Sequence, residues 1–254
     1  MTLRPILRTL VLLAVAVSAA GCVVHQRQDT PVDARHLEEP KTGNDYYLYV
    51  PSHYEPSEDW PLVITLHGTI PYDTYDKQIN EWKYLAEQKG FIVAAPELRS
   101  SQGVLPVIRS VWYNDLDKDR RAILGVLEDV QRRYNIDPRT VLITGFSGGG
   151  LPMYETALRH PGRFGMMVAR ACNFSDHQVE RIELTDKARA LPFRMYWGKD
   201  DGVRSDGWEA YRYFRRRRFP VEKEIIKGGH YRHPEIAWRY WLNILPKRHL
   251  KRMK

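Results

Sequence analysis

One serine in this chain stands in a setting suited to nucleophilic chemistry. Ser147 lies in the stretch Gly145-Phe146-Ser147-Gly148-Gly149, which fits the pattern G-x-S-x-G. The apolar residues 140–144 predict a buried strand before it and residues 150–160 a helix after it, which is the context that the pattern requires. Small neighbours allow a tight turn that exposes the hydroxyl, and the backbone N–H of Gly148 at the helix start could stabilise an oxyanion. The alternative is a glycine-rich turn that only packs a helix on a strand.

A nucleophilic serine needs a general base, and the base needs a carboxylate that orients it. His230 is the candidate base because it follows the last strand-like run, residues 221–226, in a Gly-Gly-His turn. His233 is the second choice. The candidate acid is Asp201, three residues after Gly198 in a turn that follows the apolar residues 193–197, and the adjacent Asp200 remains the alternative.

Strand-like and helix-like segments alternate along the chain, and they must position these residues. Strand-like runs occupy residues 46–50, 61–66, 91–95, 140–144, 164–171, 193–197 and 221–226. Helical patterns occupy residues 79–90, 115–134, 150–160, 178–190, 206–219 and 234–245, with Asn114 as the expected N-cap of the second. The alternation predicts an α/β fold with a mostly parallel central sheet and helices on both faces. Residues 135–138 read as a turn, and residues 100–113 as a loop over the site.

Four stretches resemble the α/β-hydrolase superfamily: PLVITLHG (61–68), YNIDPRTVLITGFSGGG (134–150), YWGKDDGV (196–203) and KGGHY (227–231). Over roughly residues 45–246 the chain is similar to exported bacterial esterases of the polyhydroxybutyrate-depolymerase and feruloyl-esterase type. The resemblance implies a serine hydrolase that uses no metal or cofactor and cleaves small-molecule or polymer esters through an acyl-enzyme. It also implies the chain order Ser147, Asp201, His230 and a first oxyanion donor at the N–H of Thr69, with His67 supporting the loop.

The superfamily leaves other functions open, because one fold hosts many activities. The chain departs from the esterase pattern after His67-Gly68, where Thr69-Ile70-Pro71 replace the glycine-rich or cysteine-rich residues common there. A serine peptidase of the same fold is one alternative. A non-catalytic binding protein of the cell envelope is another, although the full Ser/Asp/His set argues against it.

The N-terminus reads as an export signal over residues 1–21. Arg4 and Arg8 precede an apolar run at 10–17 that is too short to span a bilayer. Shortly after the run comes Ala-Ala-Gly-Cys (residues 19–22), which resembles a lipobox, so we expect Cys22 to carry a lipid anchor. Residues 22–43 would then form a flexible tether and residues 44–254 the catalytic domain, held at a membrane of the cell envelope and facing the periplasm. Plain secretion with an unmodified Cys22 is the alternative.

The net charge of +8 comes from the C-terminal part of the chain, since residues 211–254 hold 14 basic and three acidic residues. The four arginines at 215–218 predict a solvated helix face, with attraction to anionic lipid as the alternative. No nucleic-acid motif is present, so nucleic acid is not an expected partner. Two cysteines exclude a disulfide scaffold and a CxxC metal site, which leaves Cys172 as a lone, buried thiol.

Overall fold

The computed structural model describes residues 33–101 and 109–250, with the backbone alone for 109–114. The predicted signal peptide and Cys22 lie outside these residues. In the described part of the chain, no helix is both long and apolar enough to cross a membrane.

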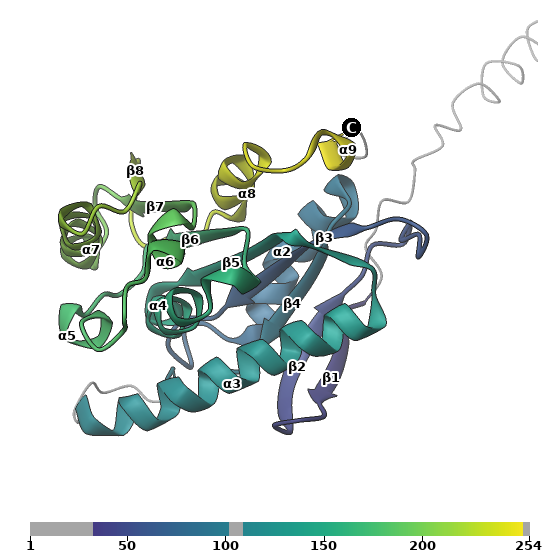
Figure 1. Cartoon of the computed structure of the whole chain (residues 1–254), viewed down its shortest axis with the longest axis horizontal. Helices are drawn as coiled ribbons and strands as arrows, with labels where there is room; N and C mark the ends of the chain where they lie inside the picture. Colours follow the sequence, from purple (N-terminus) through teal and green to yellow (C-terminus); the bar gives the residue numbers. More distant parts are fainter. Residues whose placement is uncertain (1–32, 102–108, 251–254) are drawn as a thin grey trace, which may run out of the picture. The chain divides into compact units, whose positions relative to one another are not determined.

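A single sheet of eight strands organises the described residues (Figure 1). Its order is β1-β2-β4-β3-β5-β6-β7-β8. Strand β2 runs antiparallel to both of its neighbours, and all other pairs are parallel. The strands are β1 (Arg35–Glu39), β2 (Asn44–Tyr49), β3 (Trp60–Leu66), β4 (Ile92–Pro96), β5 (Ile136–Phe146), β6 (Met166–Arg170), β7 (Phe193–Gly198) and β8 (Glu222–Ile226).

Helices cover both faces of this sheet. The described helices are α2 (Tyr75–Lys89), α3 (Arg109–Arg133), η1 (Ser147–Gly149), α4 (Gly150–Arg159), η2 (Pro161–Arg163), α5 (Asp176–Val179), α6 (Asp186–Ala190), α7 (Arg204–Arg216), α8 (Pro234–Leu242) and α9 (Lys247–Leu250). The hydrophobic core is divided accordingly, with α3, α4 and α7 contributing to one cluster and α2 and α8 to the other. The predicted α/β architecture is confirmed.

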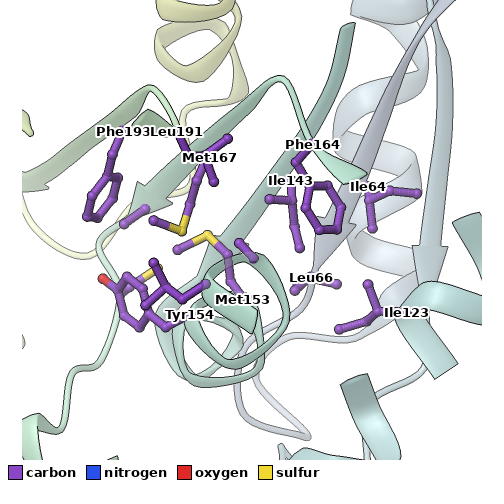
Figure 2. Packing of buried hydrophobic residues seen from close by; sticks show 14 of the residues in the cluster. Ile64, Leu66, Ile123, Ile143, Met153, Tyr154, Phe164, Met167, Leu191 and Phe193 are labelled. Carbon is purple, nitrogen blue, oxygen red and sulfur yellow. The ribbon is translucent and has the colours of Figure 1, made fainter. Parts of the chain in front are cut away.

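The division of the core follows from the alternation of side chains along each strand. In β3, Leu62, Ile64 and Leu66 belong to the cluster under α3 and α4, whereas Val63 between them faces α2 and α8. Figure 2 shows the first cluster, where side chains from β3, β5, β6 and β7 meet Ile123 of α3 and Met153 and Tyr154 of α4. Strands buried on both faces read as continuous apolar runs, which is why the sequence revealed them.

Four expectations about local structure are wrong. The tether was expected to reach residue 43, but Arg35–Glu39 forms β1, whose hydrogen bonds come from pairing with β2. Helix α3 begins at Arg109, before the expected cap, so the expected loop at 100–113 is helical from that residue on. The helix expected at 178–190 is two short helices, and the hydroxyl of Thr185 caps the second by accepting from the N–H of Ala188 at 3.1 Å. The expected turn at 135–138 opens β5.

Candidate active site

Ser147 occupies a strained turn between β5 and α4. Its φ is +51°, in the left-handed region that residues other than glycine seldom adopt. The neighbouring glycines leave no room for side chains, since a Cβ at Gly145 would lie 2.4 Å from the carbonyl oxygen of Gly149. A Cβ at Gly149 would lie 2.5 Å from the carbonyl oxygen of His67. The turn therefore needs the glycine spacing that the sequence has, and the surrounding packing maintains the strain.

The loop that follows β6 contacts this turn through a hydrogen bond and through packing. The N–H of Asn173 donates to the carbonyl of Ser147 at 2.9 Å. Cys172 packs against Gly150, where an added Cβ would lie 2.4 Å from the cysteine Cβ. Burial raises the pKa of the Cys172 thiol to about 12, so the thiol is protonated and unreactive at neutral pH.

His230 and Asp201 are hydrogen-bonded partners. The Nδ1 of His230 lies 3.0 Å from both carboxylate oxygens of Asp201. The Asp201 side chain is fully buried, and its Oδ1 also accepts from the N–H of Val203 at 2.8 Å. The histidine side chain is 35% exposed, and its ring lies against that of Phe146 with the centroids 4.7 Å apart.

The two alternative residues are placed differently. The Asp200 side chain is 65% exposed, and its carboxylate lies 4.0 Å from the ammonium of Lys199. His233 bonds to Glu235 at 2.7 Å at the start of α8. Of the two aspartates and two histidines considered, Asp201 and His230 are the pair that the structure brings together beside Ser147.

Thr69 and Gly148 face each other across the turn. A Cβ at Gly148 would lie 3.5 Å from the backbone nitrogen of Thr69. In enzymes that stabilise a developing oxyanion, two backbone N–H groups beside the nucleophile commonly supply the hydrogen bonds. A Cβ at Gly68 would lie 3.0 Å from the Cβ of Ser147, so the loop between β3 and α2 (the β3–α2 loop, residues 67–74) also touches the serine.

His67 holds the peptide that carries the Thr69 N–H. The Nδ1 of His67 bonds to the carbonyl of Gly68 at 2.8 Å, and its Nε2 accepts from the N–H of Leu98 at 2.9 Å. These two bonds define a neutral ring with the hydrogen on Nδ1, and burial lowers the pKa of His67, which keeps the ring neutral. Because the peptide between residues 68 and 69 is planar, fixing its carbonyl also fixes the direction of its N–H.

A cavity of about 470 Å³ joins these groups. Ser147, Phe146 and His230 line it together with Thr69, Tyr72, Asp73, Tyr231 and Arg232. Tyr72 and Tyr231 are 75% and 57% exposed and form part of its rim. In the described structure no hydrogen bond joins the Ser147 hydroxyl to His230, and in free enzymes such bonds often tighten only when substrate binds.

The charged residues in and beside this cavity were not predicted from the sequence. Asp73 and Arg232 line it, and the ion pairs of Arg232 connect Asp73 to Glu81. Glu81 also pairs with Arg170, which is fully buried at the end of β6. Arg170 was the one sequence feature that could have indicated this charged group. It ends an otherwise apolar strand, and a buried guanidinium requires several hydrogen-bond acceptors around it.

The segment expected to cover the site is partly described. Ser101 is buried, and its carbonyl accepts from the N–H of Ile70 at 3.0 Å. Asp119 of α3 accepts from the N–H groups of Arg99 and Ser100 at 2.7 and 3.0 Å. Burial raises the pKa of Asp119 to about 6. Residues 102–108 lie outside the described part.

One group of residues has the composition of a metal site. The potential ligand atoms of Asp59, Asp137 and His249 lie within 4.8 Å of one another. Arg248 already supplies a cation there, 2.7 Å from Asp59 and in a further ion pair with Asp137. The group lies at the start of β5, at the opposite end of that strand from Ser147.

The arginines at 215–218 do not act as one surface. Arg217 stacks on the ring of Tyr213 at 3.5 Å and pairs with Glu180 at 3.3 Å. The other three are exposed. The run therefore contributes one packed guanidinium and three solvated ones.

Similar proteins were found by sequence and by structure. A 32% identical relative, over 46% of this chain, is the bifunctional acetylxylan esterase/xylanase XynS20E of Neocallimastix patriciarum, and the chain spans only 16% of that relative's length. A ferulic acid esterase from Anaeromyces mucronatus superposes with a TM-score of 0.65 at 16% identity, covering 87% of this chain and 92% of the esterase. The S-formylglutathione hydrolase FrmB of Staphylococcus aureus gives 0.61 at 16% identity, covering 84% and 94%.

Dipeptidyl peptidase 4 of Porphyromonas gingivalis also superposes, with a TM-score of 0.61 at 16% identity over 84% of this chain and 35% of the peptidase. The strand order and these superpositions confirm the predicted α/β-hydrolase fold. The sequence model of the prolyl oligopeptidase family matches residues 77–218, more than half of the chain, and this range contains both Ser147 and Asp201. The chain belongs to the prolyl oligopeptidase family.

Proposed function

We propose that the protein is a serine hydrolase that cleaves carboxylic esters. The observation that carries this proposal is the hydrogen bond from His230 to the buried Asp201, 3.0 Å long, beside the strained Ser147 in one cavity. A serine, a histidine and a buried carboxylate that meet in this way support nucleophilic catalysis on an acyl group.

The proposed reaction has two half-reactions. His230 takes the proton of Ser147 as the hydroxyl attacks the ester carbonyl, and the N–H groups of Thr69 and Gly148 hold the oxyanion. His230 then protonates the departing alcohol, which leaves an acyl-serine. Water, deprotonated by the same histidine, then attacks the acyl-serine, and the histidine returns that proton to the Ser147 oxygen as the acid leaves. Throughout, Asp201 holds the ring in the tautomer that leaves Nε2 free to accept a proton.

Similarity supports an ester as the first substrate class to test. The 32% identical relative is named as a bifunctional acetylxylan esterase/xylanase, and a ferulic acid esterase superposes over 92% of its length. Family membership and the superposed dipeptidyl peptidase favour a peptide bond as the second candidate. A matched pair of p-nitrophenyl acetate and a proline-containing p-nitroanilide separates the two, because turnover of the anilide alone would refute the ester proposal.

Covalent labelling with a fluorophosphonate tests the nucleophile. The wild-type protein should be labelled and Ser147→Ala should not. Equal labelling, or labelling of neither, would overturn the assignment, and a protein that stays unlabelled and inactive would fit a binding role instead.

The two aspartates form a matched test of the acid. Asp201→Asn should lower kcat by a factor of about 10⁴, because the amide cannot hold the same histidine tautomer. Asp200→Asn should leave kcat unchanged, since that carboxylate is 65% exposed and bonded only weakly to Lys199. Equal losses in the two variants would contradict the role of Asp201.

We also propose that Cys22 anchors the protein to a membrane of the cell envelope. The export-type N-terminus and the lipobox-like Ala-Ala-Gly-Cys sequence support this proposal. Acyl chains attached at the cysteine would hold the hydrolase at the membrane surface. Metabolic labelling with a fatty-acid analogue should modify the wild-type protein and not Cys22→Ala, and a labelled variant would refute the proposal.

A further inference from the structure

We propose that the ion pair between Arg232 and Asp73 positions the β3–α2 loop against the loop between β8 and α8 (the β8–α8 loop, residues 227–233). This inference rests on the proposed function, because these two loops carry the proposed oxyanion donor Thr69 and the proposed base His230. Asp73 and Arg232 are 159 residues apart in the sequence, and their side chains meet at 2.8 Å.

Asp73 fixes the β3–α2 loop from inside. Its residue is 2% exposed. Its Oδ2 accepts from the N–H of Gly68 and from the side-chain amide of Gln78, each at 2.7 Å. Its Oδ1 accepts from Arg232. Gly68 is therefore held on both sides: Asp73 accepts from its N–H, and His67 holds its carbonyl, which shares a peptide group with the Thr69 N–H.

Arg232 fixes the β8–α8 loop two residues after His230. Its Nη1 donates to Asp73, and its Nε lies 2.9 Å from a carboxylate oxygen of Glu81 in α2. The Tyr196 hydroxyl donates to the carbonyls of Arg232 and His233, the latter at 3.0 Å. Both the side chain and the backbone of this residue are thus attached to the sheet and to α2.

A second arginine anchors the arrangement in the sheet. Arg170 is fully buried and pairs with Glu81, and it donates to the hydroxyls of Thr144 and Thr65 at 3.0 and 2.9 Å. These threonines belong to β5 and β3, so the guanidinium spans the strands that precede Ser147 and the β3–α2 loop. A rigid base of this kind allows a contact at Arg232 to set geometry at the serine.

The charges favour a positioning role over the binding of an anionic substrate. Arg232 and Arg170 face Asp73 and Glu81, so two guanidinium groups are matched by two carboxylates. Arg232 lines the cavity and its side chain is 37% exposed, but its Nη1 and Nε already face carboxylates. Displacement of one loop by 1 Å is enough to lower the rate of an enzyme about 100-fold.

Kinetics on p-nitrophenyl acetate test the positioning role. Arg232→Met should lower kcat by about 100-fold with little change in KM, because the guanidinium is already paired with carboxylates and the uncharged ester offers it no anionic group. Arg232→Lys keeps a cation near Asp73 and should recover part of the loss. Arg239→Met is the matched control, since Arg239 of α8 forms an exposed ion pair with Glu224 of β8 that does not involve the β3–α2 loop, and the substitution should leave kcat unchanged. A wild-type kcat in a folded Arg232→Met protein would overturn the proposal.

A double-mutant cycle tests whether the two residues act as one unit. Asp73→Asn, whose side-chain oxygen can still accept from the N–H of Gly68, and Arg232→Met together should lower kcat by less than the product of their separate factors, because both remove the Asp73–Arg232 ion pair. Multiplied losses would overturn the proposal.

Hydrogen exchange gives a readout that does not depend on activity. In Arg232→Met, peptides covering residues 67–74 should exchange faster although the substitution lies in the other loop, and Arg239→Met should leave them unchanged. Unchanged exchange at 67–74 would overturn the coupling. If exchange is faster in Arg232→Met but the wild-type protein cleaves no ester, the coupling between the loops is supported and the proposed function is refuted.

Discussion

Substitutions of His67 test how the proposed oxyanion hole is held, because different side chains remove one or both of its hydrogen bonds. His67 contacts no reacting group in the proposed mechanism, yet its Nδ1–H holds the carbonyl of Gly68 at 2.8 Å and so orients the Thr69 N–H. His67→Phe keeps a ring of similar size and removes both bonds. Complete loss of one oxyanion donor costs about 3 kcal/mol of transition-state stabilisation, or a factor of about 10² to 10³ in kcat.

The structure indicates a loss at or somewhat below the lower end of that range. Asp73 can still hold the N–H of Gly68 in the variant, as it does at 2.7 Å in the wild type, so Gly68 keeps one of its two hydrogen bonds. We therefore expect kcat of His67→Phe to fall about 30- to 100-fold. The protein also loses stability, because the carbonyl of Gly68 and the N–H of Leu98 stay buried without a partner, at about 1–3 kcal/mol each.

Two conservative substitutions distinguish catalysis from stability. The amide nitrogen of Asn can occupy the place of Nδ1, so His67→Asn should keep most of kcat while losing the bond to Leu98. His67→Gln should do the reverse, because its amide oxygen can occupy the place of Nε2. Thr140→Val is the stability control, since it removes a buried bond to the carbonyl of Asp137 at the far end of β5.

The assay is steady-state hydrolysis of p-nitrophenyl acetate, with urea unfolding of each variant. The orienting role is refuted if His67→Phe retains wild-type kcat, or if the Asn and Gln variants lose kcat equally. A loss of kcat in Thr140→Val comparable to that in His67→Phe would show that stability alone explains the result.

Two further predictions concern stability. Gly149→Ala should lower the free energy of unfolding by more than about 3 kcal/mol, because its Cβ would lie 2.5 Å from the carbonyl of His67, whereas Gly202→Ala, with no atom within 4 Å, should have little effect in urea titrations. Asp119 has a pKa of about 6 in the folded protein against an ordinary value of 3.8, so the folded state binds this proton more tightly. Its contribution to stability is therefore full below about pH 4 and is lost as the pH rises through 6, by about 3 kcal/mol in total. The difference in unfolding free energy between wild type and Asp119→Asn should follow that decline, and a difference independent of pH would contradict the assignment.

The sequence indicated the local parts of the site better than the contacts between distant parts. The glycine spacing around Ser147 is a local steric requirement, so the motif could be recognised without the structure. The choice between Asp200 and Asp201 depended on which side of a turn each carboxylate faces, and composition does not encode that. The ion pair of Asp73 with Arg232 joins residues far apart in the sequence, so no pattern in either segment predicts it.

The misplaced elements have a similar cause. The five residues of β1 are mostly polar and exposed, and they become a strand because β2 supplies their hydrogen bonds. The long apolar strands could be predicted without knowing their neighbours, since a continuous apolar run indicates a strand buried on both faces. Sequence reasoning therefore succeeded where an element determines its own structure and failed where a neighbour determines it.

The position of β8 has a consequence for how the protein tolerates mild denaturation. This strand ends the sheet order and pairs with β7 alone, and Ile225 within it is 43% exposed. Edge elements with few buried contacts open at a smaller free-energy cost than the core does. His230 follows four residues after β8, so fraying of this edge would separate it from Asp201 while β3, β5 and β6 remain paired. Catalysis by the proposed triad would then cease in a protein whose spectra still report a native sheet, and it would return without global refolding once the strand closes again.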